Sequence, residues 1–224
     1  MSSHYIAINL GNINSFGVYG KAMIPLVEKT MNLYPEYIRP NTKIFSSETD
    51  FFKNKWEINK KKEIPKKINK VMLMGVGYSE NSTWITKNLP SQLVSLDFEI
   101  RVIDFMQKHG FEVIYKAHPS SRGLINFLHS YVRTIYDPFE SVLDMADAYL
   151  FYRPMTTTFL EAFCTKLPII YLHNQHIQRD WGNDFELIRK RCAIVPTLIN
   201  ELNRLEFNED KLLAVLEKRP EEPN

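Results

Sequence analysis

The chain has 224 residues, of which 44% are hydrophobic, and its 28 basic side chains nearly balance its 26 acidic ones. That length suits one large α/β domain, and the apolar fraction excludes a disordered or fibrous chain. No apolar run reaches the roughly 20 residues of a membrane-spanning helix, and the chain does not start like a secretory signal. Two cysteines, Cys164 and Cys192, stand in apolar segments without metal-ligand spacing. We therefore expect reduced, buried thiols in a cytoplasmic protein.

The first third of the chain has a weak pattern. Residues 5–10 alternate as a strand does, and residues 22–34 have apolar side chains at helical spacing before Pro35. Residues 41–68 are expected to be irregular and polar. Because residues 1–67 are too few for a large core of their own, we expect an adaptor to, or a remnant of, something larger.

A lysine-rich stretch follows. Eight lysines and two acids lie between Lys53 and Lys70, so this stretch carries +6 and the rest of the chain −4. Such a charge block is typical of a solvated linker. The alternative is a peripheral contact with an anionic surface, such as the inner face of a membrane. Nucleic acid is not an expected partner, because lysine dominates without the interleaved arginine and aromatic residues of a nucleic-acid surface.

From residue 68 onward, short apolar segments alternate with segments of helical spacing. The expected strands are 71–76, 111–115, 132–135, 148–152, 169–172 and 193–195. The expected helices are 93–109, 124–130, 139–145, 157–165, 185–190 and 210–216. Strands that are apolar throughout and alternate with helices indicate a parallel sheet covered on both faces. The sequence thus predicts a Rossmann-like, doubly wound α/β domain over residues 68–218, with residues 219–224 as a tail.

Ligands of such sheets bind outside the carboxyl ends of the strands, so the segments that follow the strands hold the candidate site. Gly75 and Gly77 follow the first strand of this region. No GxxG completes a dinucleotide fingerprint after them, and the chain has no P-loop or nucleophile-elbow motif. A nucleotide could still approach the backbone closely at these glycines.

The second strand runs into Lys116, His118, Pro119 and Ser120. Pro119 biases His118 toward an extended backbone. An imidazole held there could donate to a phosphate oxygen or stabilise a departing diphosphate, and Lys116 would add positive charge. The alternative is a histidine that caps a loop through local hydrogen bonds.

The fourth strand leads into Arg153 and a threonine triplet, Thr156, Thr157 and Thr158, at the start of a helix that bears Glu161. Free N–H groups at a helix start attract phosphate, and threonine hydroxyls could add hydrogen bonds. Glu161 could accept hydrogen bonds from ribose or sugar hydroxyls. The alternative is ordinary capping, in which Thr157 or Thr158 caps the helix and Glu161 completes a capping box.

A metal site is not expected. His173 and His176, with Asp180 and Asp184 downstream, have a spacing that chance also produces, and no third histidine or cysteine completes a ligand set. We expect no cofactor, with a nucleotide-activated donor bound as substrate.

The runs YKAHPSS and IYDPFESVLDMADAYLFYRPMTTTFLEAFCTKLPIIYL resemble the donor-binding half of GT-B glycosyltransferases over residues 68 to about 195. They are most similar to CDP-glycerol glycerophosphotransferases and bacterial capsule polymerases, including polysialyltransferases. The resemblance implies that His118 contacts the donor phosphate and that Thr157 and Thr158 stand at the family's phosphate-binding Ser/Thr pair. It also implies transfer from a CDP-, CMP- or UDP-linked donor to a saccharide or polyol-phosphate acceptor, in surface polysaccharide or glycoconjugate synthesis.

The chain departs from this family in two ways. A threonine triplet replaces a serine-rich pair, and residues 1–67 are too few for the second Rossmann-like domain that holds the acceptor. A second GT-B half or a partner protein is therefore an expected partner. Two alternatives stay open: a catalytically incomplete nucleotide-binding or assembly module that partners a separate transferase, and an isomerase of the UDP-sugar 2-epimerase kind.

Overall fold

The computed structural model describes residues 15–18, 24–32, 43–46, 50–78, 91–153, 156–174 and 184–220. It divides into two compact units, residues 1–54 and residues 55–224. The expected strand over residues 5–10 lies outside the described residues. The expectation that residues 1–67 are an adaptor or remnant, ahead of a domain at 68–218, stays a prediction.

The first unit contains a small parallel sheet. Strands β1 (Ser15–Val18) and β2 (Lys43–Ser46) pair in parallel. Helix α2 (Ile24–Met31) lies within the range predicted for a helix, and it contributes Val27 to a small apolar cluster. The helix predicted from the apolar spacing of this segment is therefore confirmed.

The expectation of irregular chain over residues 41–68 is wrong in part, because β2 and helix α3 (Phe51–Asn59) fall there. The partner of β2 in the sheet comes far earlier in the chain, and such a pairing leaves no local signal. Helix α3 was not predicted because its lysines made the segment look like polar, irregular chain. Lysine is nevertheless a good helix former, and its long side chain keeps its charge in water.

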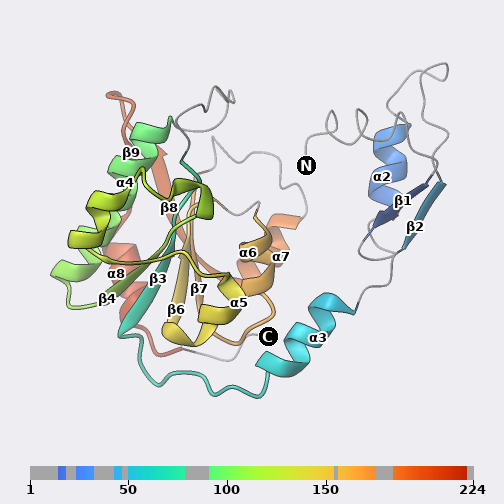
Figure 1. Cartoon of the computed structure of the whole chain (residues 1–224), viewed down its shortest axis with the longest axis horizontal. Helices are drawn as coiled ribbons and strands as arrows, with labels where there is room; N and C mark the ends of the chain where they lie inside the picture. Colours follow the sequence, from blue (N-terminus) through green and yellow to red (C-terminus); the bar gives the residue numbers. More distant parts are fainter. Residues whose placement is uncertain are drawn as a thin grey trace. The chain divides into compact units, whose positions relative to one another are not determined.

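A seven-stranded sheet organises the second unit (Figure 1), in the order β5-β4-β3-β6-β7-β8-β9. Its strands are β3 (Lys70–Met74), β4 (Glu112–Lys116), β5 (Arg133–Ile135), β6 (Ala148–Phe151), β7 (Ile169–His173), β8 (Cys192–Ile199) and β9 (Leu205–Phe207). The first six strands are parallel and β9 is antiparallel to β8. Numbered along the chain, the parallel strands stand in the order 3-2-1-4-5-6 of doubly wound sheets, which is compatible with a Rossmann-like fold.

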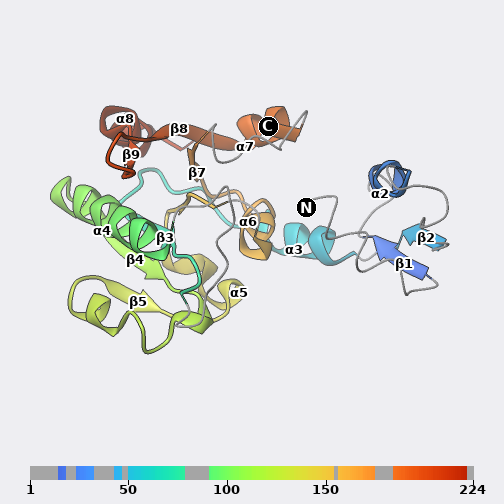
Figure 2. The same cartoon turned by 90° about the horizontal axis from the view of Figure 1, so that it is seen from above.

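Helices cover both faces of this sheet (Figure 2). Helices α4 (Gln92–Lys108) and α8 (Glu209–Glu217) pack into one apolar cluster with the sheet. Helices α5 (Phe139–Val142), α6 (Thr157–Ala162) and α7 (Asp184–Arg191) pack into a second cluster on the other face. The predicted α/β class, with a mostly parallel sheet covered on both faces, is therefore confirmed.

Two expectations for this unit are wrong. The segment predicted as a helix over 124–130 forms a short 3-10 helix, Asn126–Ser130, because little chain lies between Gly123, at φ +93°, and β5. Strand β9 was not predicted. It pairs with β8 through a tight turn in which Asn203 adopts φ +58°, and three residues are too few to show periodicity.

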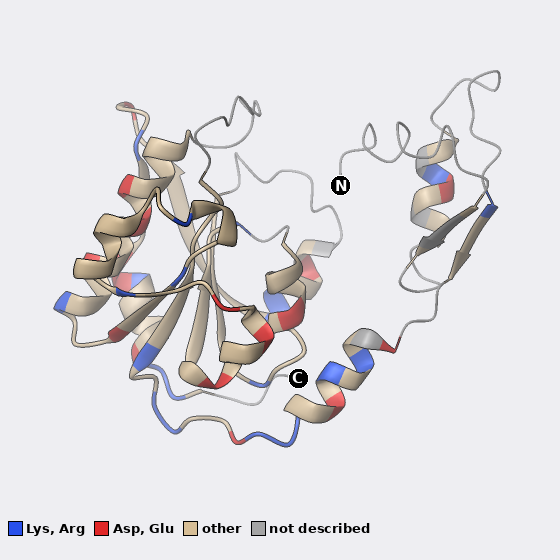
Figure 3. Ribbon diagram, in the orientation of Figure 1, with Lys and Arg blue, Asp and Glu red and all other residues tan. Residues whose placement is uncertain are grey.

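Ion pairs attach three lysines of the lysine-rich stretch to other elements of the second unit, and much of the stretch is exposed to solvent. Residues 55–70 hold seven lysines and two glutamates, so basic side chains dominate the stretch (Figure 3). Lys55 pairs with Glu161, Lys62 with Asp144 and Lys70 with Glu112, whereas Lys60 pairs with Glu57 inside the stretch. Asn59 and Ile68 are buried. Contact with an anionic surface stays a prediction, and these ion pairs leave fewer unpaired lysines for such a contact.

No helix in the described ranges is both long and apolar enough to cross a bilayer.

Both cysteines are buried free thiols, as expected. Burial raises the pKa of the Cys164 thiol and raises the pKa of Cys192 to about 12. Because the thiolate is the nucleophile, we expect neither to react with a thiol reagent at neutral pH in the folded chain, and both to react in denaturant. Spectrophotometric thiol titration checks this, and fast modification of either thiol without denaturant would contradict it.

Candidate functional site

Two loops meet at the carboxyl edge of the sheet, where the strand order reverses. β3 lies between β4 and β6, so the loop after β3 starts at the crevice in which doubly wound sheets bind ligands. The Tyr78 N–H donates to Ser121 Oγ over 2.8 Å, and Ser121 Oγ donates to the Val76 carbonyl over 3.3 Å. Ser120 Oγ also lies 3.4 Å from the Tyr78 carbonyl oxygen. The loops after β3 and β4 are thus held to each other.

His118 lies on this joined pair of loops. Its backbone is extended, at φ −71° and ψ 140°, as Pro119 predicts. The Ser120 N–H donates to His118 Nδ1 over 3.2 Å, and Ser120 Oγ lies 2.7 Å from the same nitrogen. Because a backbone N–H can only donate, Nδ1 is an acceptor and the neutral ring carries its proton on Nε2. The predicted local cap therefore exists, and it leaves an exposed Nε2–H donor without a partner among the described residues.

Other side chains approach both glycines after β3 closely, and at Gly75 the approach leaves no room for a Cβ. A Cβ on Gly75 would lie 2.1 Å from Tyr115 Oη. A Cβ on Gly77 would lie 3.2 Å from His118 Nδ1 and 3.1 Å from Ser120 Oγ. The backbone at Gly77 thus packs directly against the imidazole, and the structure brings Gly77, His118 and Ser120 together.

Arg153 and Lys116 lie on different faces of the sheet. The Arg153 guanidinium donates to Ser95 Oγ of α4 over 2.8 Å, so it lies on the α4 side. Lys116 follows Tyr115, which packs in the α4 cluster, so strand alternation directs it to the opposite face. The Lys116 ammonium donates to the Ala117 carbonyl over 3.0 Å, and burial lowers its pKa. The structure therefore does not bring Lys116 together with Arg153.

Helix α6 is capped one residue earlier than expected. The side chain of Thr156 accepts the Phe159 N–H over 3.1 Å, so the alternative in which Thr157 or Thr158 caps the helix and Glu161 completes a capping box is wrong. Sequence alone does not fix the first residue of a helix within a run of three threonines. The hydroxyls of Thr157 and Thr158 have no hydrogen-bond partner in the described part of the chain.

Glu161 and the predicted histidine pair make other contacts. The Glu161 carboxylate lies 3.1 Å from Lys55 Nζ, and both side chains are largely covered. His173 Nδ1 lies 3.3 Å from Tyr171 Oη, and its ring lies against Phe185. His176 and Asp180 fall outside the described residues, and the described ones hold no group of three metal-ligating side chains.

A buried glutamate beneath the two loops was not predicted. Glu99 of α4 is fully buried and accepts hydrogen bonds from the Val76 N–H and from three tyrosine hydroxyls, those of Tyr78, Tyr115 and Tyr152. The sequence did carry a signal, because helical spacing places Glu99 on the same face of α4 as its buried apolar residues.

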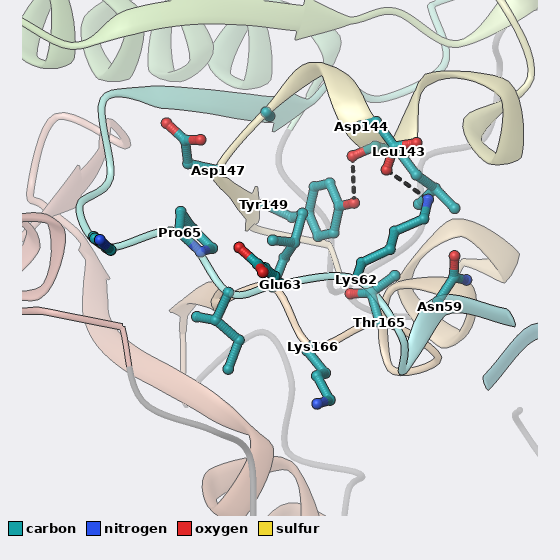
Figure 4. Close-up of a pocket in the computed structure, with 14 residues that line it drawn as sticks. Asn59, Lys62, Glu63, Pro65, Leu143, Asp144, Asp147, Tyr149, Thr165 and Lys166 are labelled. Atoms are coloured by element: carbon teal, nitrogen blue, oxygen red, sulfur yellow. Dashed lines mark hydrogen bonds and ion pairs between the residues drawn. The ribbon is translucent and has the colours of Figure 1, made fainter. Parts of the chain in front are cut away.

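A cavity of about 320 Å³ lies at the opposite edge of the sheet, near the amino ends of β6 and β7 (Figure 4). Three lysines and three carboxylates line it, among them Lys62 and Asp144, whose Nζ and Oδ1 lie 2.5 Å apart. Asp147 accepts the N–H groups of Asn69 and Lys70 over 2.9 Å and 2.8 Å. The positive and negative charges that line this cavity balance and are partly paired, and none of the site residues predicted from the sequence lines it. We therefore place the candidate site at the carboxyl edge.

Comparison with models of protein families, with curated proteins and with solved structures finds no match in any of the three. The carboxyl edge carries the imidazole N–H of His118, the hydroxyls of Thr157 and Thr158, and the guanidinium of Arg153, which also donates to Ser95. Groups of these kinds can donate to phosphate oxygens.

Proposed function

We propose that the second unit binds a nucleotide-activated donor at the carboxyl edge of its sheet and acts as a GT-B type glycosyltransferase or glycerophosphotransferase. The observation that carries this proposal is the geometry of His118. Its Nδ1 accepts from Ser120 and faces Gly77, which leaves the Nε2–H of this exposed residue without a partner among the described residues, at the strand-order reversal. A donor fixed in this way can bond to a phosphate oxygen without further rearrangement.

The roles of the site residues in the proposed transfer follow from the negative charge that develops on the leaving phosphate. Transfer breaks the bond between the transferred group and the nucleotide phosphate while an acceptor hydroxyl forms the new bond, so negative charge develops on the leaving phosphate. His118 Nε2–H would bond to that phosphate, and the Arg153 guanidinium and the hydroxyls of Thr157 and Thr158 would add further donors. The acceptor and the base that takes its proton would come from a second GT-B half or a partner protein.

The second candidate is a nucleotide-binding module without catalysis, and the acids near the site favour it. Glu99 accepts four hydrogen bonds in the core, and Glu161 is paired with Lys55. Neither is available as a general base. A module of this kind would bind the nucleotide and leave turnover to its partner.

Isothermal titration calorimetry with CMP, CDP, UDP and GDP tests both candidates at the level of binding. We expect saturable binding of one nucleotide family, weakened about tenfold by His118→Ala, which removes a hydrogen bond to a charged group. The Thr157→Ala/Thr158→Ala double variant should weaken it as well. His129→Ala, which removes an exposed histidine from the 3-10 helix before β5, is the matched control and should bind as the wild type does.

Absence of binding for all four nucleotides, or equal affinities of His118→Ala and the wild type, would contradict the proposal. Assays with a bound donor then separate the candidates. Release of nucleotide that depends on an acceptor supports the transferase, and binding without release supports the module. Isomerisation of a nucleotide sugar without any acceptor would instead indicate the epimerase alternative.

A further inference from the structure

Glu99 lies where helix α4 meets the sheet, under the strand-order reversal. Its side chain is fully buried, in a helix whose other buried residues, apart from Ser95, are apolar. Four groups donate to it: Val76 N–H to Oε1 at 2.9 Å, Tyr152 Oη to Oε1 at 2.7 Å, and Tyr78 Oη and Tyr115 Oη to Oε2 at 2.6 Å each. One carboxylate therefore joins α4 to β4, to the end of β6 and to the loop after β3.

The chemistry of these donors calls for a carboxylate. A backbone N–H can only donate, and the phenol hydroxyls of three tyrosines can donate together only to a group that accepts throughout. An ionised carboxylate offers about four lone-pair positions on two oxygens, which matches the four donors. A glutamine would place an NH₂ group against two of them, and buried donors left without acceptors cost free energy.

Two of the four donors belong to the loop after β3, and these connect Glu99 to His118. Val76 and Tyr78 flank Gly77, whose backbone packs against the imidazole. Residues 76–78 also bond to Ser121 in the next loop, and the Tyr78 carbonyl oxygen lies 3.4 Å from Ser120 Oγ. The position of Gly77 relative to His118 is thus fixed from below by Glu99 and from the side by the two serines.

We propose that Glu99 is the positioning residue of the carboxyl-edge site, holding Val76 and Tyr78 so that Gly77 and His118 form one rigid surface. Its effect on nucleotide affinity rests on the proposed function, whereas its effect on the loop does not. Glu99 would act through the loop and would not touch the nucleotide.

Two tyrosine variants make a matched pair for the test. Tyr78→Phe and Tyr115→Phe each remove a buried hydroxyl that bonds to Oε2 over 2.6 Å, but Tyr78 is in the loop and Tyr115 is in β4. Amide hydrogen exchange at Val76, read by NMR, reports on the loop. Titration of the nucleotide selected by calorimetry reports on the site, and urea unfolding reports on stability.

We expect the two tyrosine variants to lose similar stability, because each loses one buried hydrogen bond. Tyr78→Phe alone should speed exchange at Val76 and weaken nucleotide binding about fivefold, which corresponds to one hydrogen bond. Glu99→Gln should speed exchange at Val76 and weaken nucleotide binding more strongly than Tyr78→Phe does. If Glu99→Gln does not fold, the tyrosine pair decides.

Equal exchange at Val76 in both tyrosine variants would overturn the proposal, and so would faster exchange with an unchanged nucleotide affinity. If the wild type binds no nucleotide, the proposed function fails by itself. The exchange at Val76 then still decides whether Glu99 positions the loop, so the two failures are distinguishable.

Discussion

Replacing Gly75 by alanine is expected to lower the free energy of unfolding by about 3 kcal/mol, the upper end for an overpacked core. The added Cβ would lie 2.1 Å from Tyr115 Oη and 2.3 Å from Cζ. The tyrosine has no room to move, because its ring is fully buried and its hydroxyl bonds to Glu99. Relieving the clash therefore means shifting β4 or breaking that hydrogen bond. Urea unfolding followed by circular dichroism measures the change.

Gly77→Ala is the matched control, two residues further along the same loop. Its Cβ would meet Ser120 Oγ and His118 Nδ1 at 3.1–3.2 Å, and the exposed imidazole can shift by the few tenths of an ångström needed. We expect it to cost less than about 1 kcal/mol, as for most exposed positions. If Gly75→Ala were no more destabilising than Gly77→Ala, the close packing of Tyr115 on Gly75 would be wrong.

These two glycines show which features of the site could be predicted from the sequence and which could not. Apolar runs bounded by helices predicted the parallel sheet, because strands buried on both faces are apolar throughout. Because the carboxyl ends of parallel strands lie at one edge of a sheet, the same prediction placed His118 and Gly77 at one edge. It could not show why Gly75 is glycine, because the residue that excludes a side chain there, Tyr115, comes 40 positions later in the chain and approaches only when β3 and β4 pair.

The candidate site shows the same limit. Pro119 predicted the extended backbone of His118, which is a local effect. Whether Lys116 joins His118 depends on the face of β4 to which it points, and whether Glu161 is available depends on Lys55, more than 100 residues earlier. Long-range charge pairing of this kind leaves no pattern in a single sequence. Helical spacing could place Glu99 on the buried face of α4, but it could not identify its four hydrogen-bond donors, which come from three separate segments.

Glu99 should also give the stability of the chain a measurable pH dependence. Burial raises the pKa of Glu99 above its ordinary value of 4.5, because the loss of hydration outweighs the four hydrogen bonds to its carboxylate. The folded chain then holds this proton more tightly than the unfolded chain does. Its contribution to stability is therefore fully present below about pH 4.5 and is lost as the pH rises through the folded pKa. Each unit of the shift corresponds to about 1.4 kcal/mol.

The comparison of wild type with Glu99→Gln isolates this effect, because both chains keep the other titrating groups. Asp97, whose pKa is lowered by Arg204 and Arg101, contributes the opposite slope to both. The three tyrosines that bond to Glu99 stay neutral over this range, because burial raises the pKa of each above its ordinary value. Urea unfolding from pH 4 to pH 8 should show the wild type losing stability relative to the variant. Parallel curves, together with an ordinary pKa for the Glu99 carboxyl in a ¹³C NMR titration, would show that four hydrogen bonds fully offset its burial.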